Sequence, residues 1–265
     1  MDIAGILMAT GIVGAVGLFV GLFLGVAGIK FKVDVDEREE AILGVLPGNN
    51  CGGCGYAGCS ALAKAIVAGE APVNGCPVCK ANTETIGKIS DVMGVEAVES
   101  ARTAAFVKCS GTCDKAEIKF NYYGIEDCKK AMTVPGAGNK MCASGCLGLG
   151  TCVKACAFDA IHIIDGVSVV DRDKCAACGK CVEVCPKNII ELLPYDARNK
   201  VACSNHDKGK AVKTVCSAGC IACGVCVKQC EAEAIKLENN LPVIDYEKCT
   251  GCGKCAAKCP SHVIV

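Results

Sequence analysis

The chain has 265 residues, of which 26 are cysteine and none is tryptophan, and its formal net charge is +0. This balance gives no indication of a nucleic-acid partner, because proteins of that class carry an excess of Lys and Arg. Aromatic residues make up only 4% of the chain, so its core has to be built from aliphatic side chains and from whatever the cysteines bind.

The first predicted element is a membrane anchor at residues 1–30. No residue from Ile3 to Ile29 is charged, and this run exceeds the roughly 20 apolar residues that cross a bilayer. A cleaved signal peptide needs a basic start and a shorter apolar core, whereas here Asp2 is acidic and Lys30 and Lys32 follow the run. Positive charge after the helix predicts a single-pass protein of the cell membrane with its bulk on the cytoplasmic side.

Three glycines of this run, Gly17, Gly21 and Gly25, stand four residues apart. Small residues at this spacing let another helix approach closely, although glycine is also common in membrane spans without a fixed partner. We expect this face to dock against another membrane protein.

Residues 31–90 are predicted to form a small helical module. A helix at Glu39–Leu46 follows a charged linker, and Ser60 is a candidate N-cap for a second helix at Ala61–Ala68. A glycine-rich loop with four thiols, enough for one [4Fe–4S] cluster, lies in this module. These thiols are Cys51, Cys54, Cys59 and Cys76.

A connecting segment, residues 91–137, follows the module. It is predicted to contain a helix at Glu96–Val107 and carries three further thiols, Cys109, Cys113 and Cys128.

From Cys142 onward the cysteines repeat at a fixed offset of 74 positions. The pattern C-x2-C-x2-C-x3-C-P occurs twice, from Cys175 to Pro186 and from Cys249 to Pro260, and it is typical of bacterial ferredoxins with two [4Fe–4S] clusters. We therefore predict two tandem ferredoxin-like domains of the α+β class, at residues 138–200 and 201–265.

A β-hairpin is predicted inside each repeat. Asp165-Gly166 between alternating apolar residues is a strong turn signal for a hairpin at Ala160–Val170, and Ala234–Ile244 is its counterpart. Short helices are expected after the cysteine loops, at Cys152–Cys156 and Cys181–Cys185 and at the equivalent positions of the second repeat.

The fourth cysteine of each ferredoxin run serves the neighbouring cluster. In the second repeat this rule predicts one cluster on Cys220, Cys223, Cys226 and Cys259. It predicts another on Cys230, Cys249, Cys252 and Cys255.

The first repeat departs from this pattern at Leu149, which stands where the second repeat has Cys223. One of its clusters is complete, on Cys156, Cys175, Cys178 and Cys181. The other has only Cys146, Cys152 and Cys185. It is either a three-iron or open site, or Cys142 replaces the missing ligand, and we favour Cys142.

These assignments use 20 thiols for at least five clusters and leave a sixth open. The remaining thiols are Cys79, Cys109, Cys113, Cys128, Cys203 and Cys216. Cys128 and Cys203 fall one residue off the offset of 74, so we interpret them as an upstream extension of the duplication. A sixth cluster would use Cys109, Cys113 and Cys128 with one of Cys142, Cys203 or Cys216, and the alternative is a set of buried free thiols.

Disulfide bonds and zinc sites fit the cysteine pattern less well than iron–sulfur clusters do. Disulfide scaffolds are usually short secreted chains. Structural zinc prefers two separated C-x2-C pairs, not three thiols in one tight loop. No Ser/His/Asp or paired-carboxylate arrangement stands out, so we predict no catalytic residue and no nucleotide-binding site in this chain.

The segment Ile42–Cys59, with one N-terminal span before it and ferredoxin modules after it, resembles the B-subunit family of the Rnf complexes. The stretch Gly145–Cys152 is similar to the cluster-rich, clostridial-type members. Cys79 departs from the family, where glycine is expected.

This resemblance implies a subunit of a membrane-bound ferredoxin:NAD+ oxidoreductase that couples electron flow to Na+ or H+ translocation. The chain would accept electrons from soluble ferredoxin, while NAD and flavin would bind to partner subunits. The alternative is an electron-transfer subunit of a membrane-anchored hydrogenase or formate dehydrogenase, which has no reason to carry the module with Cys51–Cys76. A zinc-loaded scaffold protein is a third hypothesis.

Overall fold

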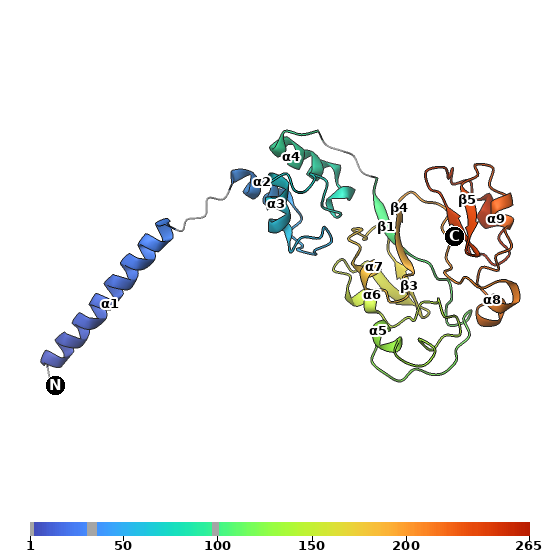
Figure 1. Ribbon diagram of the computed structural model, residues 1–265, viewed down its shortest axis with the longest axis horizontal. Helices are drawn as coiled ribbons and strands as arrows, with labels where there is room; N and C mark the ends of the chain where they lie inside the picture. The colour runs from blue at the N-terminus through green and yellow to red at the C-terminus, as the bar shows by residue number, and fades with distance from the viewer. Residues whose placement is uncertain (1–2, 31–35, 97–100) are drawn as a thin grey trace.

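The computed structural model describes residues 3–30, 36–96 and 101–265 (Figure 1). Along the chain it has a long helix, a small helical module and two units that each contain a β-hairpin. This mixed content of helix and sheet confirms the α+β class predicted from the sequence.

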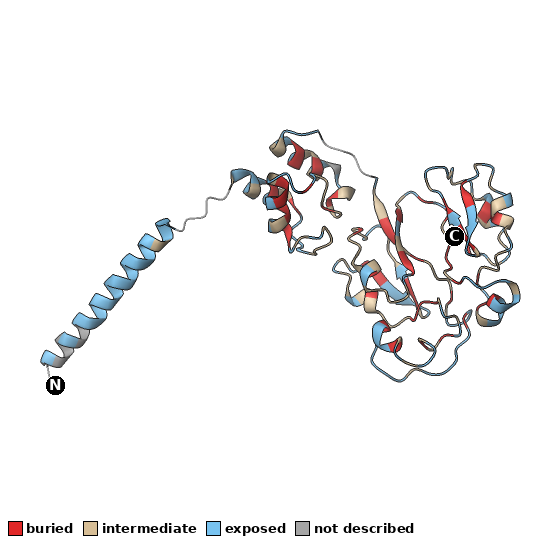
Figure 2. Cartoon of the chain, viewed as in Figure 1, coloured by how far each residue is buried: buried red, intermediate tan, exposed pale blue. Residues whose placement is uncertain are grey.

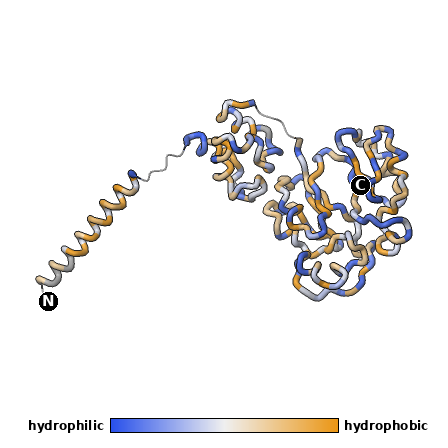
Figure 3. The backbone as a smooth tube through the Cα atoms, viewed as in Figure 1, coloured by the Kyte–Doolittle hydropathy of each residue, from blue (hydrophilic) through white to orange (hydrophobic). Residues whose placement is uncertain are grey.

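Helix α1 (Ile3–Lys30) has Lys30 as its one charged residue, and Figure 3 shows mostly hydrophobic colouring before that end. Its stretch Gly11–Lys30 is the one helical segment of the described residues that is long and apolar enough to cross a bilayer. This agrees with the predicted membrane anchor. Asp2 and Lys32, which entered the prediction of its orientation, lie outside the described residues.

The N-terminal module packs short helices around an aliphatic core. Its helices are α2 (Glu37–Val45), α3 (Cys59–Val67), η1 (Cys79–Ala81) and α4 (Thr83–Met93). Ile42, Leu62, Ile66 and Ile89 are at most 1% exposed and form the centre of this core (Figure 2). Burying four such side chains is the main apolar contribution to the stability of a module this small.

Helix α3 begins at Cys59 and not after the predicted cap Ser60. The backbone N–H of Cys59 donates to Oδ1 of Asn50 at 2.8 Å. Because this side chain from the preceding loop satisfies a free N–H at the helix start, a local capping residue is not needed there.

The helix predicted at Glu96–Val107 is wrong for residues 101–107, which the structure describes. Residues 97–100 of that prediction lie outside the described part. Strand β1 (Thr103–Val107) instead pairs antiparallel with β4 (Ile190–Pro194), with Val107 opposite Ile190. A pairing partner more than eighty positions away overrides the local helical pattern. Part of the predicted connecting segment therefore belongs to the first ferredoxin-like unit, which we define as residues 101–199.

Both predicted hairpins are confirmed. In the first unit β2 (Ile161–Ile164) pairs with β3 (Val167–Val170), and in the second unit, residues 200–265, β5 (Ile235–Glu238) pairs with β6 (Leu241–Ile244). Short helices follow the cysteine loops, as predicted. They are α6 (Thr151–Lys154), α7 (Lys180–Val184), α9 (Val225–Lys228) and α10 (Lys254–Ala257). Two more helices precede the cysteine loops, α5 (Cys128–Ala131) and α8 (Gly209–Val215).

The second unit repeats the β1–β4 pairing in shorter form. Val201 bridges to Ile264, and the N–H of Ala202 donates to the carbonyl of Val263 at 2.8 Å. In the first unit Val107 lies opposite Ile190, and the N–H of Lys108 donates to the carbonyl of Ile189 at 2.7 Å. Because the two arrangements match residue for residue, the strand segments before the cysteine loops are also duplicated.

This equivalence corrects one interpretation of the sequence. Cys109 lies two residues after Val107, and Cys203 lies two residues after Val201, so Cys109 and not Cys128 is the counterpart of Cys203. Cys128 lies in additional chain that only the first unit has between this position and Cys142.

The core of the N-terminal module provides a first prediction. Ile42→Ala removes a side chain that is 0% exposed and should cost about 2–5 kcal/mol of the module's stability, because the cavity left behind cannot fully close. Leu43→Ala, in the same helix but 40% exposed, is the matched control and should cost much less. Hydrogen exchange of the α3 and α4 amides in the full chain measures both. Equal protection of these amides in the two variants would contradict this description of the core.

Candidate iron–sulfur centres

The second unit contains two cavities, each lined by four thiols. Site 2A is lined by Cys220, Cys223, Cys226 and Cys259. Site 2B is lined by Cys230, Cys249, Cys252 and Cys255. The structure thus brings together the two sets of thiols that the crossover rule of ferredoxins predicts. Cys259 lies in site 2A, whereas its neighbours in sequence, Cys252 and Cys255, lie in site 2B.

The first unit also has two such cavities, but one of them departs from the prediction. Site 1B is lined by the expected Cys156, Cys175, Cys178 and Cys181. Site 1A is lined by Cys128, Cys146, Cys152 and Cys185. The sequence favoured Cys142 as the fourth thiol of site 1A, but the structure lines this cavity with Cys128. Cys142 lines another cavity, described below.

Helix α5 explains how Cys128 reaches site 1A. Asp127 caps this helix, and the N–H of Cys128 donates to Oγ1 of Thr151 at 2.7 Å. Oγ1 of Thr151 in turn donates to Oδ2 of Asp127 at 3.2 Å. Thr151 is the first residue of α6, so these bonds fix the additional chain of the first unit against the cysteine loop of site 1A.

The loop around Leu149 keeps the conformation of a ligand loop. Gly148 and Gly150 have φ angles of 73° and 73°, and the equivalent residues of the second unit, Ala222 and Gly224, have 56° and 69°. Leu149 itself packs against the small cluster that contains Cys128. The first unit therefore retains the backbone of the motif while its fourth thiol comes from outside the loop.

We call the four predicted thiols of the N-terminal module, Cys51, Cys54, Cys59 and Cys76, site N. Cys54, Cys59 and Cys76 share the core of this module, whereas Cys51 lies near Cys178. Cys59 and Cys76 are buried, and the other two are half-buried. A hydrogen bond from the neighbouring thiol of Cys79 lowers the pKa of Cys76 to about 6, and the same contact raises the pKa of Cys79. The lowered pKa favours the thiolate form of Cys76, which is the form that binds metal.

The thiol environments fit polynuclear clusters. Backbone N–H groups donate to Cys156, Cys175 and Cys259 at 3.4 Å each, and such bonds stabilise cluster sulfurs and influence their reduction potential. Burial raises the pKa of Cys181 to about 12 and that of Cys226 to about 11, so iron binding must displace their protons.

The cysteine spacing favours polynuclear clusters over single zinc ions. The ferredoxin runs place three thiols in one tight loop, whereas structural zinc prefers two separated pairs of cysteines.

Site N lies against site 1B. The loop of the N-terminal module packs so closely on Cys178 that a Cβ at Gly53 would be 2.6 Å from the carbonyl oxygen of Cys178. Burial raises the pKa of Cys178, and the thiol of Cys51 contributes to that rise as a nearby charge. A side chain larger than hydrogen at position 53 would separate the two loops.

Comparison with known families supports iron–sulfur binding along the chain. The FeS family model, described as an Fe-S cluster module, matches residues 46–78. The 4Fe-4S binding domain matches residues 168–191, and the 4Fe-4S dicluster domain matches residues 219–264. These matches establish [4Fe–4S] clusters as the cofactor class.

Relatives of known name align over nearly the whole chain. The B subunit of the Na(+)-translocating ferredoxin:NAD(+) oxidoreductase complex of Acetobacterium woodii is 47% identical over 98% of this chain and 77% of its own length. The B subunit of the ion-translocating oxidoreductase complex of Methanosarcina acetivorans is 42% identical, with coverages of 96% and 95%. The B subunit of the proton-translocating ferredoxin:NAD(+) oxidoreductase complex of Clostridium ljungdahlii is 41% identical, with coverages of 94% and 88%.

The placement of Cys128 in site 1A gives a second prediction. Cys128→Ala should convert one four-iron cluster to a three-iron cluster, because three thiols remain. Adding Leu149→Cys should restore it, since the loop of residue 149 already has the backbone of a ligand loop. Low-temperature EPR of the oxidised protein detects the three-iron species.

Cys142→Ala, with and without Leu149→Cys, is the matched control. Because Cys142 lines a different cavity, Leu149→Cys should not compensate for its loss. If Leu149→Cys restored the four-iron cluster in Cys142→Ala and not in Cys128→Ala, Cys142 and not Cys128 would be the fourth ligand of site 1A.

Proposed function

The chain belongs to the B-subunit family of the Rnf complexes, electron-relay subunits of ion-translocating oxidoreductases, and we propose that it carries electrons from reduced ferredoxin toward NAD+ through cysteine-bound clusters. A [4Fe–4S] cluster supplies a centre that takes up and gives back one electron at a time. The protein holds these centres, excludes water from them and sets the gaps between them.

The proposal assigns five clusters to the described sites. Site N uses Cys51, Cys54, Cys59 and Cys76, and sites 1A, 1B, 2A and 2B use the thiols that line them. Cys156 and Cys185 cross between the two sites of the first unit, as Cys230 and Cys259 do in the second. Each crossing cysteine follows a short helix that contains a thiol of the other site, which keeps the two sites close together.

The observation that carries the proposal is the contact between Gly53 and Cys178. It joins the N-terminal module to site 1B without any intervening side chain. Electron tunnelling falls steeply with distance, so a glycine at this contact shortens the step that links the module to the ferredoxin-like units. A chain that only stored iron would not need the loops of Gly53 and Cys178 to lie this close together.

The proposed partners follow from the family and from the composition of α1. The relatives are subunits of multi-subunit complexes, so we propose contacts with other subunits of such a complex, which would bind flavin and NAD. Soluble ferredoxin is the proposed electron donor. The ion pathway is assigned to other subunits, because the described part of α1 contains no carboxylate.

We further propose that α1 holds the chain at the cytoplasmic face of the membrane. Lys30 at the C-terminal end of the span follows the positive-inside rule. A reducing compartment also suits a chain whose thiols have to bind iron, because disulfide bonds form and persist in oxidising compartments.

A substitution at Gly53 tests the contact between Gly53 and Cys178. Gly53→Val should slow electron transfer from reduced ferredoxin to NAD+ severalfold in the assembled complex, because the new Cβ pushes the N-terminal module away from Cys178. Gly87→Ala, in α4 with no heavy atom within 4 Å of the added Cβ, is the control and should leave the rate unchanged. An unchanged rate in Gly53→Val would remove the observation on which the relay path rests.

Removal of residues 1–30 tests the role of the anchor. The truncated chain should be a soluble, brown protein that still oxidises reduced ferredoxin, because its clusters are held by its own thiols. It should no longer support NAD+ reduction by membranes, because the gap to the next carrier is no longer fixed. Full transfer from ferredoxin to NAD+ by the truncated chain alone would show that it contains a nicotinamide site and is not a relay subunit.

A further inference from the structure

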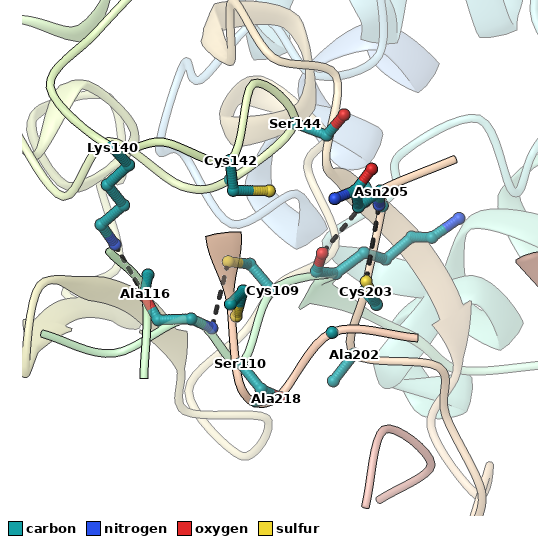
Figure 4. A pocket seen from close by; sticks show the side chains of 16 residues that line it. Cys109, Ser110, Ala116, Lys140, Cys142, Ser144, Ala202, Cys203, Asn205 and Ala218 are labelled. Carbon is teal, nitrogen blue, oxygen red and sulfur yellow. Dashed lines mark hydrogen bonds between the residues drawn. The ribbon is translucent and has the colours of Figure 1, made fainter. Parts of the chain in front are cut away.

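The two ferredoxin-like units enclose a further cavity lined by four thiols (Figure 4). We call it the bridging cavity, and its thiols are Cys109, Cys142, Cys203 and Cys216. The matched families at residues 46–78, 168–191 and 219–264 include none of these four cysteines.

Each unit contributes the same pair of thiols. Cys142 and Cys216 are related by the offset of 74, and both lie four residues before the first ligand of an A site, within C-A-S-G-C and C-S-A-G-C. Cys109 and Cys203 are related by the matching strand pairs, within V-K-C-S and V-A-C-S. The bridging cavity is therefore built symmetrically by the duplication and needs both units to be complete.

The backbone around the bridging cavity is also duplicated. The N–H of Gly111 donates to Sγ of Cys109 at 3.4 Å, and the N–H of Asn205 donates to Sγ of Cys203 at 3.5 Å. These donors stand at the same position after each cysteine. Hydrogen bonds of this kind stabilise a thiolate bound to iron, and they match those at sites 1B and 2A.

A buried cation completes the bridging cavity. Lys140 is 5% exposed and lines the cavity, and its Nζ donates to the carbonyls of Gly111 at 2.7 Å and Gly166 at 3.0 Å. None of the residues that line the cavity is acidic. A buried ammonium group requires a compensating negative charge, and four thiolates around a cluster provide it.

We propose that the bridging cavity binds a sixth [4Fe–4S] cluster, which connects site 1A of the first unit to site 2A of the second. The proposal rests on the relay function proposed above and adds the step between the two units. A cluster held by these four thiols would accept one electron from the cluster on one side, which would be oxidised, and would pass it to the cluster on the other side, so that no bond would be made or broken.

Two hydrogen bonds place the bridging cavity next to both neighbours. The N–H of Cys146, a thiol of site 1A, donates to Sγ of Cys109 at 3.3 Å. The N–H of Cys220, a thiol of site 2A, donates to Sγ of Cys203 at 3.4 Å. On each side a single residue therefore links the sulfurs of successive sites. With the bridge, the relay is continuous from site N to site 2B.

The iron content of anaerobically reconstituted full-length protein tests the proposal. Six clusters predict about 24 irons per chain, at four per cluster. Cys216→Ser should convert the bridging cluster to a three-iron species or empty the site, which lowers the iron to between about 23 and about 20, and should remove one four-iron signal from the EPR-monitored redox titration. Cys113→Ser, at an exposed thiol that does not line the bridging cavity, is the matched control and should keep about 24.

Lys140→Met provides a second variant that retains all four thiols. Loss of the buried positive charge should make the reduction potential of the bridging cluster more negative than in the wild type, because the extra electron is no longer compensated.

About 20 irons in the wild type, or equal iron in Cys216→Ser and Cys113→Ser, would overturn the sixth cluster. If this 20-iron protein still transferred electrons from ferredoxin to NAD+ within the complex, the relay function would stand without the bridge. A 24-iron protein unable to oxidise reduced ferredoxin would instead overturn the relay function and leave the bridging cluster in place.

Discussion

Bonding between thiolates and iron is the interaction on which the fold of this chain depends. Each of the three larger cores contains cysteine, for example Cys59 in the N-terminal module, Cys152 in the first unit and Cys255 in the second. The hairpins and helices of the two units are only four or five residues long, apart from α8, and such short elements cannot bury a large apolar face. Cluster binding therefore supplies much of the folding free energy, as it does in other small metal-dependent domains.

The duplication explains most of the architecture, and the additional chain of the first unit explains where the two units differ. The two units share hairpins, strand pairing and left-handed residues such as Asp159 and Glu233, at φ of 50° and 51°. The first unit differs by the chain between Cys109 and Cys142, which brings Cys128 to site 1A in place of a thiol at Leu149. In the proposed assignment this additional chain supplies the fourth thiol of site 1A, and Cys142 remains available to the bridging cavity.

Sequence patterns predicted the parts of the site that depend on short-range spacing. Thiols two or three residues apart have to lie in one loop, so the sets of the second unit and of site 1B could be assigned directly. The origin of the fourth thiol at site 1A could not, because Cys128 reaches it through Asp127 and Thr151, a contact between distant segments. Strand β1 was mistaken for a helix for the same reason, since its partner β4 is remote in sequence. The segment V-x-C-S occurs at both Val107 and Val201 and indicates that Cys109 and Cys203 are equivalent. A comparison at a fixed offset of 74 positions misses this equivalence, because the first unit has additional chain after Cys109.

We propose that the thiols form one unbroken series of iron sites from the N-terminal module to the C-terminus. Crystals of the anaerobically purified protein allow a direct test by anomalous scattering at the iron absorption edge. Six iron peaks are expected, one at each four-thiol set, including a peak between Cys109, Cys142, Cys203 and Cys216. Absence of iron at that position, with the other five sites filled, would show that the series is interrupted between the two units.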